Sequence, residues 1–243
     1  MRGSVLIMAK APQPGRVKTR LAPLLGASGC ARLQAELIRH TAAWARDAAP
    51  RVWLAYAPRD ARGQIGRLAG PGVGLLPQAG PDLGARLAAA TAQVLARGEA
   101  PVFAIGTDAP LLGPADVAAA RDALAAGHEV ALVPALDGGY AMIALTRALP
   151  EAFAIPVPAW GGPEVLELTL AALRGRGLRI ALLDPVGDLD TPDDALALRA
   201  HPGCPPRIRA ALRPEARSRA ARPGVGSEAR TRPDGAVPRH GVS

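Results

Sequence analysis

The sequence predicts an α/β fold with a mostly parallel sheet, one antiparallel element and helices on both faces. Short apolar runs alternate with longer amphipathic segments along the chain, which is the pattern of βα units. The chain has 243 residues, of which 49% are hydrophobic, and this is enough for one large domain with a well-buried core. We find no internal repeat.

Seven short apolar runs predict the strands, namely residues 4–9, 51–57, 73–76, 101–106, 129–134, 140–145 and 178–183. The first run, Ser-Val-Leu-Ile-Met-Ala, is apolar at successive positions, which indicates a strand buried on both faces. Only a few residues separate 129–134 from 140–145, too few for a crossover helix. We therefore expect these two strands to be antiparallel.

Amphipathic segments between the runs predict the helices, namely residues 28–47 (approximately), 59–69, 82–97, 114–126, 163–175 and 192–200. In the third of them, Leu83, Leu87, Ala90 and Val94 recur along one side of a helix. A loop over 10–23, rich in proline, separates the first strand from the first helix.

The end of the chain differs in composition. From His201 onward it is rich in Pro, Gly and Arg and has no apolar periodicity, so we expect residues 1–200 to form the domain and residues 201–243 a disordered basic tail. The tail contains nine arginines against three acidic residues and holds most of the net charge of +8. Because the excess charge lies outside the domain, we expect no specific nucleic-acid partner.

Neither a membrane segment nor a zinc site is indicated. No run approaches the roughly 20 apolar residues of a membrane span, and the apolar run near the N-terminus is too short for a signal-peptide core. These two features predict a cytoplasmic protein. Cys30 and Cys204 form no Cys-x-x-Cys pair, and four scattered histidines give no zinc spacing.

Four cations follow the first predicted strand. Lys10, Arg16, Lys18 and Arg20 lie within eleven residues, and Gly15 gives the loop freedom to wrap a ligand. Ligands of open parallel sheets bind beyond the carboxyl ends of the strands. Two like charges about 4 Å apart repel by roughly 4 kcal/mol at an effective dielectric of 20, so a bound anion would relieve a real cost. We predict that these five residues bind nucleotide phosphates; a solvated basic loop is the alternative.

This loop is not a Walker loop. Lys18 and Thr19 follow Gly15, but Val17 stands where that motif requires a second glycine. The chain also has no Gly-x-Gly-x-x-Gly fingerprint and no Gly-x-Ser-x-Gly motif. A phosphate-binding loop of another kind is therefore expected.

Acidic residues follow three other predicted strands. Asp108 follows the strand over 101–106, Asp137 follows 129–134, and both Asp188 and Asp190 follow 178–183. Carboxylates that converge at one sheet edge repel one another unless a divalent cation lies between them, and Mg²⁺ or Mn²⁺ prefers carboxylate and phosphate oxygens. We predict a metal site at Asp108, with Asp190 or Asp137 as its second ligand.

Local structure offers alternatives for these acidic residues. Asp108 precedes a proline-containing turn that it could cap, and Asp137-Gly138-Gly139 suits an ordinary hairpin turn. Residues 191–194 have the features of a helix start, with Pro192 at the first helical position. These alternatives stay open at this stage.

Two further segments are candidates for the remaining ligand contacts. Gly138, Gly139, Tyr140 and Trp160 are expected to line an acceptor pocket, although a core tryptophan beside a turn is an equal interpretation of Trp160. Residues 78–86 are candidates for contact with a base or a sugar. Asp82 is the nucleotide-binding candidate in that segment, and it could instead start a helix.

Five motifs, taken together, resemble a known family. They are Ala9-Lys-Ala-Pro-x-Pro-Gly-Arg-Val-Lys-Thr-Arg-Leu-Ala-Pro23, Gly106-Thr-Asp-Ala-Pro110, Asp137-Gly-Gly-Tyr140, Trp160-x-x-Pro-x-Val165 and Asp188-x-Asp-Thr-Pro192. They look like the bacterial GT-A-like glycosyltransferases, which are associated with radical-SAM and arsenosugar-type gene neighbourhoods and were long described as a domain of unknown function. The match runs through residues 3–200.

The resemblance implies a GT-A, or nucleotide-diphospho-sugar transferase, fold. It also implies that Asp108 is the first metal carboxylate and that Lys18 and Arg20 sit at the phosphates. Asp190 corresponds to a second metal ligand of related nucleotidyltransferases. The chain departs from the family at Gly161-Gly162, which replaces a usual Ser-Thr pair and removes two hydroxyl groups from the expected acceptor region.

A second resemblance points to a different reaction. The segment from Lys18 to Pro23, together with Asp137-Gly-Gly and Asp190-Thr-Pro, is similar to 2-phospholactate guanylyltransferases and, more distantly, to molybdenum-cofactor guanylyltransferases. A shared fold does not settle which reaction is catalysed.

The leading hypothesis from the sequence is glycosyl transfer from a nucleotide sugar to a small-molecule acceptor. A bound Mg²⁺ or Mn²⁺ would act as Lewis acid, Lys18 and Arg20 would stabilise the departing nucleotide, and Asp137 would be the base for the acceptor hydroxyl. The second hypothesis is nucleotidyl transfer from an NTP such as GTP or CTP, with release of pyrophosphate. The third is a non-catalytic nucleotide-binding module.

Overall fold

Seven strands form one sheet in the order β3-β2-β1-β4-β6-β5-β7. The computed structural model describes residues 3–214. The strands are β1 (Ser4–Lys10), β2 (Arg51–Ala57), β3 (Val73–Pro77), β4 (Val102–Ile105), β5 (Val130–Pro134), β6 (Tyr140–Leu145) and β7 (Ile180–Leu182). Strand β6 is antiparallel to both of its neighbours, and all other pairs are parallel. The predicted fold class, including its antiparallel element, is confirmed.

Helices occupy the connections between the strands. They are α1 (Ala22–Ala48), α2 (Arg62–Ala69), α3 (Leu83–Leu95), α4 (Pro114–Ala125), α5 (Val165–Arg174), α6 (Pro192–Ala200) and α7 (Pro206–Ala211). Short 3-10 turns are η1 (Thr19–Leu21), η2 (Arg59–Ala61), η3 (Pro150–Phe153) and η4 (Val157–Ala159). Helix α1 begins six residues before the predicted start, and Gly26 interrupts it with a positive φ of 66°. That interruption hides the first turns from a search for regular apolar periodicity.

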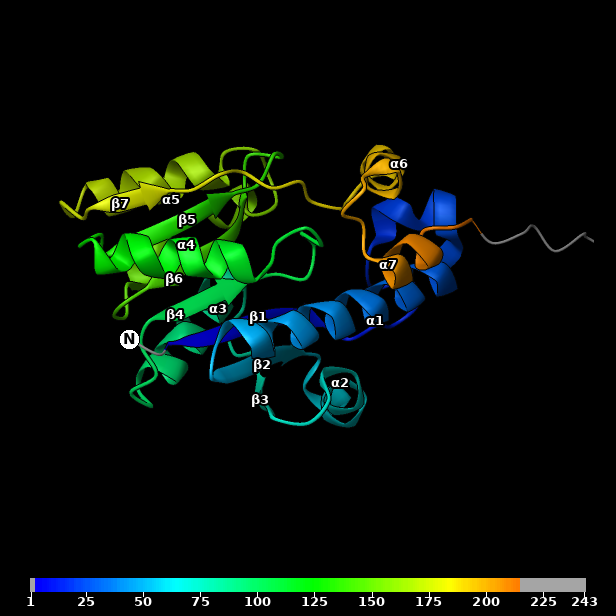
Figure 1. The fold of residues 1–243 in the computed structure, drawn as a ribbon, viewed down its shortest axis with the longest axis horizontal. Coiled ribbons are helices and arrows are strands. Elements are labelled where there is room, and N and C mark those ends of the chain that lie inside the picture. The colour runs from blue at the N-terminus through cyan, green and yellow to red at the C-terminus, as the bar shows by residue number, and fades with distance from the viewer. Residues whose placement is uncertain (1–2, 215–243) are drawn as a thin grey trace, which may run out of the picture.

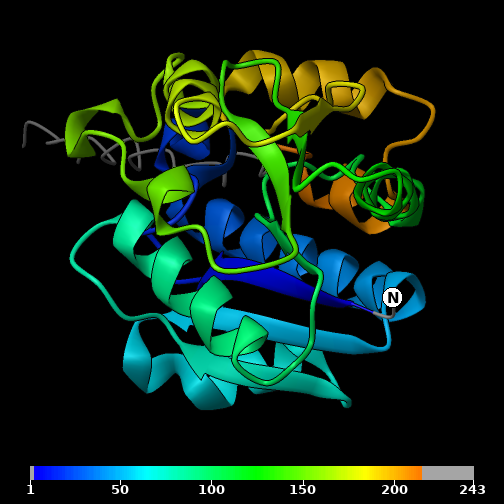
Figure 2. The ribbon, with the colours of Figure 1, turned by 90° about the vertical axis from the view of Figure 1, so that its left-hand side faces the viewer.

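The helices form a layer on each face of the sheet. Residues of α1, α2 and α4 share one hydrophobic cluster, and residues of α3 and α5 share the other. Strand β1 contributes to both clusters in alternation: Val5 and Ile7 face one layer, whereas Leu6 and Met8 face the other. Figure 1 shows α1 and α4 in front of the sheet, and Figure 2 gives the view turned by 90°. The first strand is therefore buried on both faces, as predicted.

A third hydrophobic cluster lies beyond the carboxyl ends of the parallel strands. This cluster joins the start of α1 to α6 and α7. We call α6 and α7, together with the residues that this cluster buries, the α6–α7 lobe (Figure 1). Leu189 lies in this cluster with no exposed surface, and so does Leu21, which lies near the end of the predicted loop over residues 10–23. Because both residues are anchored in the lobe, it positions the chain segments that carry Lys18 and Asp190.

The structure corrects the predicted boundary of the tail. Residues 201–214 are not disordered: they contain α7, and Cys204, Ile208 and Leu212 are buried in the lobe. These three apolar residues are spaced four apart, but only Ile208 lies within α7, and Pro and Arg residues around them obscure the pattern. Residues 215–243, the rest of the predicted tail, lie outside the described residues.

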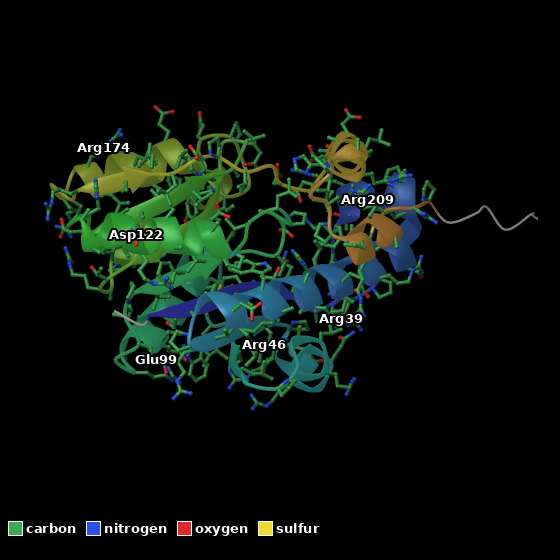
Figure 3. All side chains as sticks on the ribbon, viewed as in Figure 1. Arg39, Arg46, Glu99, Asp122, Arg174 and Arg209 are labelled. Atoms are coloured by element: carbon green, nitrogen blue, oxygen red, sulfur yellow. The ribbon has the colours of Figure 1, made fainter. Side chains whose placement is uncertain are left out.

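Charged side chains such as Arg39 and Arg46 are exposed on the outer side of α1 (Figure 3). Within residues 3–214, no helix combines the length and the apolar character that crossing a membrane requires. Cys30 and Cys204 are both buried free thiols.

Candidate active site

A cleft of about 620 Å³ opens at the carboxyl ends of β1 and β4, on the side of the α6–α7 lobe. Every site residue predicted from the sequence lines it except Gly15 and Gly138. The lining residues come from the segments after β1, β3, β4, β5 and β7 and from residues around Trp160. Segments far apart in the sequence therefore meet at the sheet edge where the prediction placed them.

Lys18 is the centre of this arrangement. Its Nζ lies 2.7 Å from Asp108 Oδ1 and 3.0 Å from Asp190 Oδ1, and it donates a hydrogen bond of 2.6 Å to the carbonyl oxygen of Leu189. The Lys18 side chain is only 4% exposed. Burial alone would lower the pKa of Lys18, but the attraction of Asp108 and Asp190 outweighs it and raises that pKa. The buried ammonium therefore stays charged.

The backbone around Lys18 explains how a lysine reaches this position. Lys18 adopts left-handed dihedral angles (φ 50°, ψ 38°), which are uncommon for a residue with a side chain. The next residues form the short turn η1, whose Leu21 is held in the lobe. The Sγ of buried Cys30 donates to the carbonyl oxygen of Lys18 (3.2 Å). The lysine is thus directed inward by a turn that is fixed on both sides.

Asp108 lies just beyond β4, and its carbonyl oxygen accepts a hydrogen bond from the backbone N–H of Leu189 (2.8 Å). This bond joins the segment after β4 to the segment after β7. The Asp108 side chain is 55% exposed and points its Oδ1 at Lys18. Among residues 3–214, its carboxylate caps no backbone N–H of the turn that follows, so the alternative of a simple turn cap lacks support.

The segment that carries Asp190 serves two purposes. Thr191 caps α6, and Asp194 completes a capping box with it, so the helix-start interpretation of residues 191–194 is confirmed. Asp190 remains available to the cleft, where its Oδ2 lies 3.8 Å from Arg20. Burial, together with the negative charges of Asp137 and Asp194, raises the pKa of Asp188 to about 6. The cleft therefore concentrates negative charge beside a buried cation.

The carboxylates of Asp108 and Asp190 lie 2.7 and 3.0 Å from the Lys18 ammonium, so they are close enough together to contact one ligand. The described residues contain no group of three or more His, Cys, Asp or Glu side chains suited to hold a metal. Mg²⁺ characteristically binds through one or two carboxylates, with substrate phosphates and waters completing its coordination. The two carboxylates fit a cation of that kind, in which case the nucleotide would supply further ligands.

The Asp137 turn closes another side of the cleft. Asp137 Oδ1 accepts a hydrogen bond from the N–H of Gly139 (2.9 Å), so the interpretation as a tight turn between β5 and β6 holds. Gly138 has a φ of 92°, and a Cβ there would overlap the carbonyl oxygen of Pro163. The Gly138 carbonyl oxygen accepts from the N–H of Leu166 (2.9 Å). Only glycine permits this contact between the turn and the start of α5.

Tyr140 and Trp160 have both a core and a cleft surface. Each packs against the hydrophobic cluster of α3 and α5 and also lines the cleft. Within the described part of the chain, Tyr140 Oη and Trp160 Nε1 are buried without a hydrogen-bond partner. The core interpretation of Trp160 is therefore correct in part, and its place in an acceptor pocket stays a prediction.

Asp82 caps α3 by accepting a hydrogen bond from the N–H of Ala85 (2.8 Å), which confirms its alternative role at a helix start. It also lines the cleft. Lys10 and Arg16 are exposed and form no ion pair with any residue between 3 and 214. These two cations are thus available to an anionic ligand.

Two glutamines line the cleft: Gln78 begins the segment 78–86 that the sequence offered for contact with a base or a sugar, whereas Gln34 was not predicted. The Gln78 amide nitrogen donates to the carbonyl oxygens of Ala9 (3.2 Å) and Ala55 (2.9 Å), at the ends of β1 and β2. The Gln34 amide nitrogen donates to Lys10 and Thr107, at the ends of β1 and β4. A polar residue on the otherwise apolar face of the predicted first helix was the available signal for Gln34.

Comparison with known proteins places the chain among nucleotide-dependent transferases. The model of a family described as "Uncharacterized protein conserved in bacteria (DUF2064)" matches residues 40–157. Phosphoenolpyruvate guanylyltransferase of Rubrobacter xylanophilus is 31% identical over 200 residues, which cover 80% of this chain and 93% of that protein. The gene neighbourhood suggested by the first resemblance is not shown by these matches.

Two solved structures support the fold. A candidate nucleotide-diphospho-sugar transferase of Desulfovibrio desulfuricans G20 superposes with a TM-score of 0.78 at 26% identity, over 87% of this chain and 94% of that one. A Methanothermobacter nucleotidyl transferase superposes with a TM-score of 0.55 at 17% identity, over 83% and 98% of the two chains. The second likeness shows the fold alone.

Proposed function

Because this chain belongs to the family of phosphoenolpyruvate guanylyltransferase, we propose that it is a nucleotidyltransferase that uses GTP and a small anionic acceptor. The observation that carries the proposal is the buried Lys18 ammonium between the carboxylates of Asp108 and Asp190. A polyphosphate with its divalent cation presents both signs of charge, and this point of the cleft offers a partner for each.

The order of the strands suggests an order for the substrates. Gln78 binds the ends of β1 and β2, the Lys18–Asp108 pair lies beyond β1 and β4, and Gly139 lies at the start of β6. Neighbouring strands are about 4.8 Å apart. We assign the nucleoside to the region of Gln78 and Asp82, the phosphates to Lys18 and its neighbours, and the acceptor to the side of Gly139 and Trp160.

In the proposed reaction, an oxygen of the acceptor's phosphate attacks the α-phosphorus of GTP. A new phosphoanhydride bond forms, the bond between the α- and β-phosphates breaks, and pyrophosphate leaves with the electron pair. Lys18 and Arg20 stabilise the negative charge on the pyrophosphate, while Lys10 and Arg16 bind the outer phosphates. A divalent cation held by Asp108 and Asp190 supplies Lewis-acid stabilisation to the phosphates when it is bound.

The chemistry of the acceptor favours this reaction over transfer to a hydroxyl group. A phosphate acceptor is ionised at neutral pH and needs no general base. Asp137, the candidate base from the sequence, is exposed and already accepts a hydrogen bond from Gly139. No neighbouring cation among the described residues orients it. Lys10 and Arg16, which form no ion pair within residues 3–214, suit an acceptor or donor that carries several negative charges.

Glycosyl transfer, the leading hypothesis from the sequence, is the second candidate. It is supported by the likeness to the Desulfovibrio protein, at a TM-score of 0.78 and 26% identity. In that reaction an acceptor hydroxyl on the side of Trp160 attacks the anomeric carbon, Asp137 takes its proton, and a nucleoside diphosphate leaves. Lys18 and Arg20 have the same role towards the departing phosphates.

Product analysis separates the candidates. Purified protein is incubated with Mg²⁺ and, in turn, GTP or CTP with phosphoenolpyruvate or 2-phospholactate, and a panel of nucleotide sugars with hydroxyl acceptors. Pyrophosphate release that requires a phosphorylated acceptor supports nucleotidyl transfer. Release of a nucleoside diphosphate from a nucleotide sugar would replace it with glycosyl transfer. Saturable binding without turnover of any substrate would identify a binding module. Asp108→Asn is the control for a contaminating enzyme.

A further inference from the structure

A buried glutamine connects the two strands above which the cleft opens. Gln34 lies in the middle of α1 and is 4% exposed. Its amide nitrogen donates to the carbonyl oxygen of Lys10, at the end of β1, and to the hydroxyl oxygen of Thr107, just beyond β4, at 3.2 Å in both cases. Thr107 is equally buried. Gln34 and Thr107 therefore lie beneath the loops after β1 and β4, which carry Lys18 and Asp108.

The partners of Gln34 determine the direction of these hydrogen bonds. A carbonyl oxygen only accepts, so the amide nitrogen of Gln34, rather than its oxygen, must face Lys10. The same nitrogen donates to Thr107 Oγ1, which turns the hydroxyl hydrogen of Thr107 away from Gln34. The acceptor within reach of that hydrogen is Asp108 Oδ1, at 3.4 Å. Donation thus runs from Gln34 through Thr107 to Asp108.

The consequence for Asp108 is that its two oxygens differ. Oδ1 accepts a hydrogen bond from the Thr107 hydroxyl and forms an ion pair with the Lys18 ammonium, and these two groups come from different segments of the chain. No hydrogen bond or ion pair within residues 3–214 engages Oδ2, although the side chain is 55% exposed and lines the cleft. Contacts behind a ligating carboxylate orient it and strengthen the binding of a metal. Asp108 thus presents Oδ2 to a ligand while Oδ1 is held.

We infer that Gln34 and Thr107 are positioning residues, which orient the Asp108 carboxylate towards the divalent cation of the nucleotide. The effect on cation binding rests on the proposed function, whereas the orientation of the Asp108 carboxylate does not depend on it. The competing explanation is that Gln34 only ties β1 to β4. In that case its loss would lower the stability of the protein and leave Asp108 unaffected.

The test uses Thr107→Val, which keeps the shape of the side chain and removes the hydroxyl group, and Thr107→Ser, which retains the hydroxyl. Gln34→Met provides an independent interruption of the same chain of hydrogen bonds. Electron paramagnetic resonance measures Mn²⁺ affinity in the presence of GTP, and calorimetry measures GTP affinity in EDTA. We expect Thr107→Val and Gln34→Met to weaken Mn²⁺ binding about 10–100-fold. Thr107→Ser should restore it, and GTP affinity in EDTA should be nearly unchanged.

A double-mutant cycle shows whether the effect passes through Asp108. Thr107→Val should add almost nothing to the loss caused by Asp108→Asn. The inference is overturned if Thr107→Val weakens Mn²⁺ binding by the same factor with and without Asp108, or if Thr107→Ser binds as poorly as Thr107→Val.

Crystal structures of the ligand-free wild type and Thr107→Val separate this inference from the proposed function. We expect Asp108 to occupy one rotamer in the wild type and more than one in the variant. An unchanged, single rotamer in the variant would overturn the positioning role. If the wild type binds neither Mn²⁺ nor GTP, the proposed function fails, and the Asp108 rotamer still decides whether Thr107 orients it.

Discussion

Replacing Lys18 by methionine separates the stability of the cleft from its chemistry. The variant retains an unbranched stem in the buried site and removes the ammonium group that contacts Asp108, Asp190 and the carbonyl oxygen of Leu189 at 2.6–3.0 Å. Hydrogen bonds to charged groups typically contribute about 1.5–3 kcal/mol. Two opposing effects reduce the cost of losing them here.

Burial of an ammonium group itself costs several kcal/mol, and the variant is free of that cost. The carboxylates left without a partner are 55% exposed at Asp108 and 39% exposed at Asp190, so water can solvate them. We therefore expect the free energy of unfolding to fall by no more than about 2 kcal/mol. A urea titration at neutral pH measures this change.

The effect on catalysis should be much larger. Removing one preorganised group that stabilises developing charge typically lowers kcat about 10²–10³-fold. Lys10→Met is the matched control, because the only other lysine is exposed and forms no ion pair within the described chain. Because Lys10 is assigned to binding the outer phosphates and not to the buried charge centre, its removal should raise the KM for GTP but change turnover at saturating GTP less than about fivefold, the equivalent of 1 kcal/mol. Pyrophosphate release at saturating GTP and Mg²⁺ measures both variants.

Two results would refute this reasoning. Full turnover by Lys18→Met would show that the buried ammonium has no part in the reaction. Loss of more than about 4 kcal/mol of stability would identify Lys18 as a structural residue instead, because breaking a fully buried ion pair has a cost of that size. An equal loss of turnover in Lys10→Met would indicate a general effect of charge.

Three further predictions concern other parts of the molecule. Gly138→Ala should abolish activity, because the added methyl group would overlap Pro163. Gly161→Ala, at a φ of 82° with no atom within 4 Å, should cost only backbone strain of about 1–2 kcal/mol. Activity assays and thermal unfolding of both variants measure the difference. Truncation after residue 214 should keep the melting temperature, and truncation after residue 200 should lower it, because α7 is removed. Burial lowers the pKa of His40, so the native state resists protonation and the free energy of unfolding decreases as pH falls below about 6.5. Urea titrations of His40→Gln should show a weaker dependence of stability on pH. The same pH dependence in the variant and the wild type would contradict this prediction.

Much of the fold could be predicted because its signals are local. The apolar run of β1 is continuous, as burial on both faces requires, and the short gap between 129–134 and 140–145 left room only for an antiparallel pair. Helix α7 was missed for the opposite reason. Its apolar positions become meaningful only when they meet Leu21 and Leu189 in the lobe.

The site was predictable in composition but not in its contacts. Strand ends indicated which charged residues would meet, since the carboxyl ends of parallel strands share one edge. The contact between Lys18 and Asp190 spans 172 positions in the sequence and depends on a left-handed residue that no local pattern marks. Gln34 likewise acquires its role only when β1 and β4 are neighbours.

The most direct measurement is a calorimetric titration of GTP into the wild-type protein and into Asp108→Asn, with Mn²⁺ and with EDTA. If the nucleotide's phosphates and cation occupy the point between Lys18, Asp108 and Asp190, the wild type will bind GTP saturably and more tightly with Mn²⁺. Asp108→Asn will lose that gain. GTP affinity that is the same with and without Mn²⁺, or the same gain in both proteins, would contradict the account.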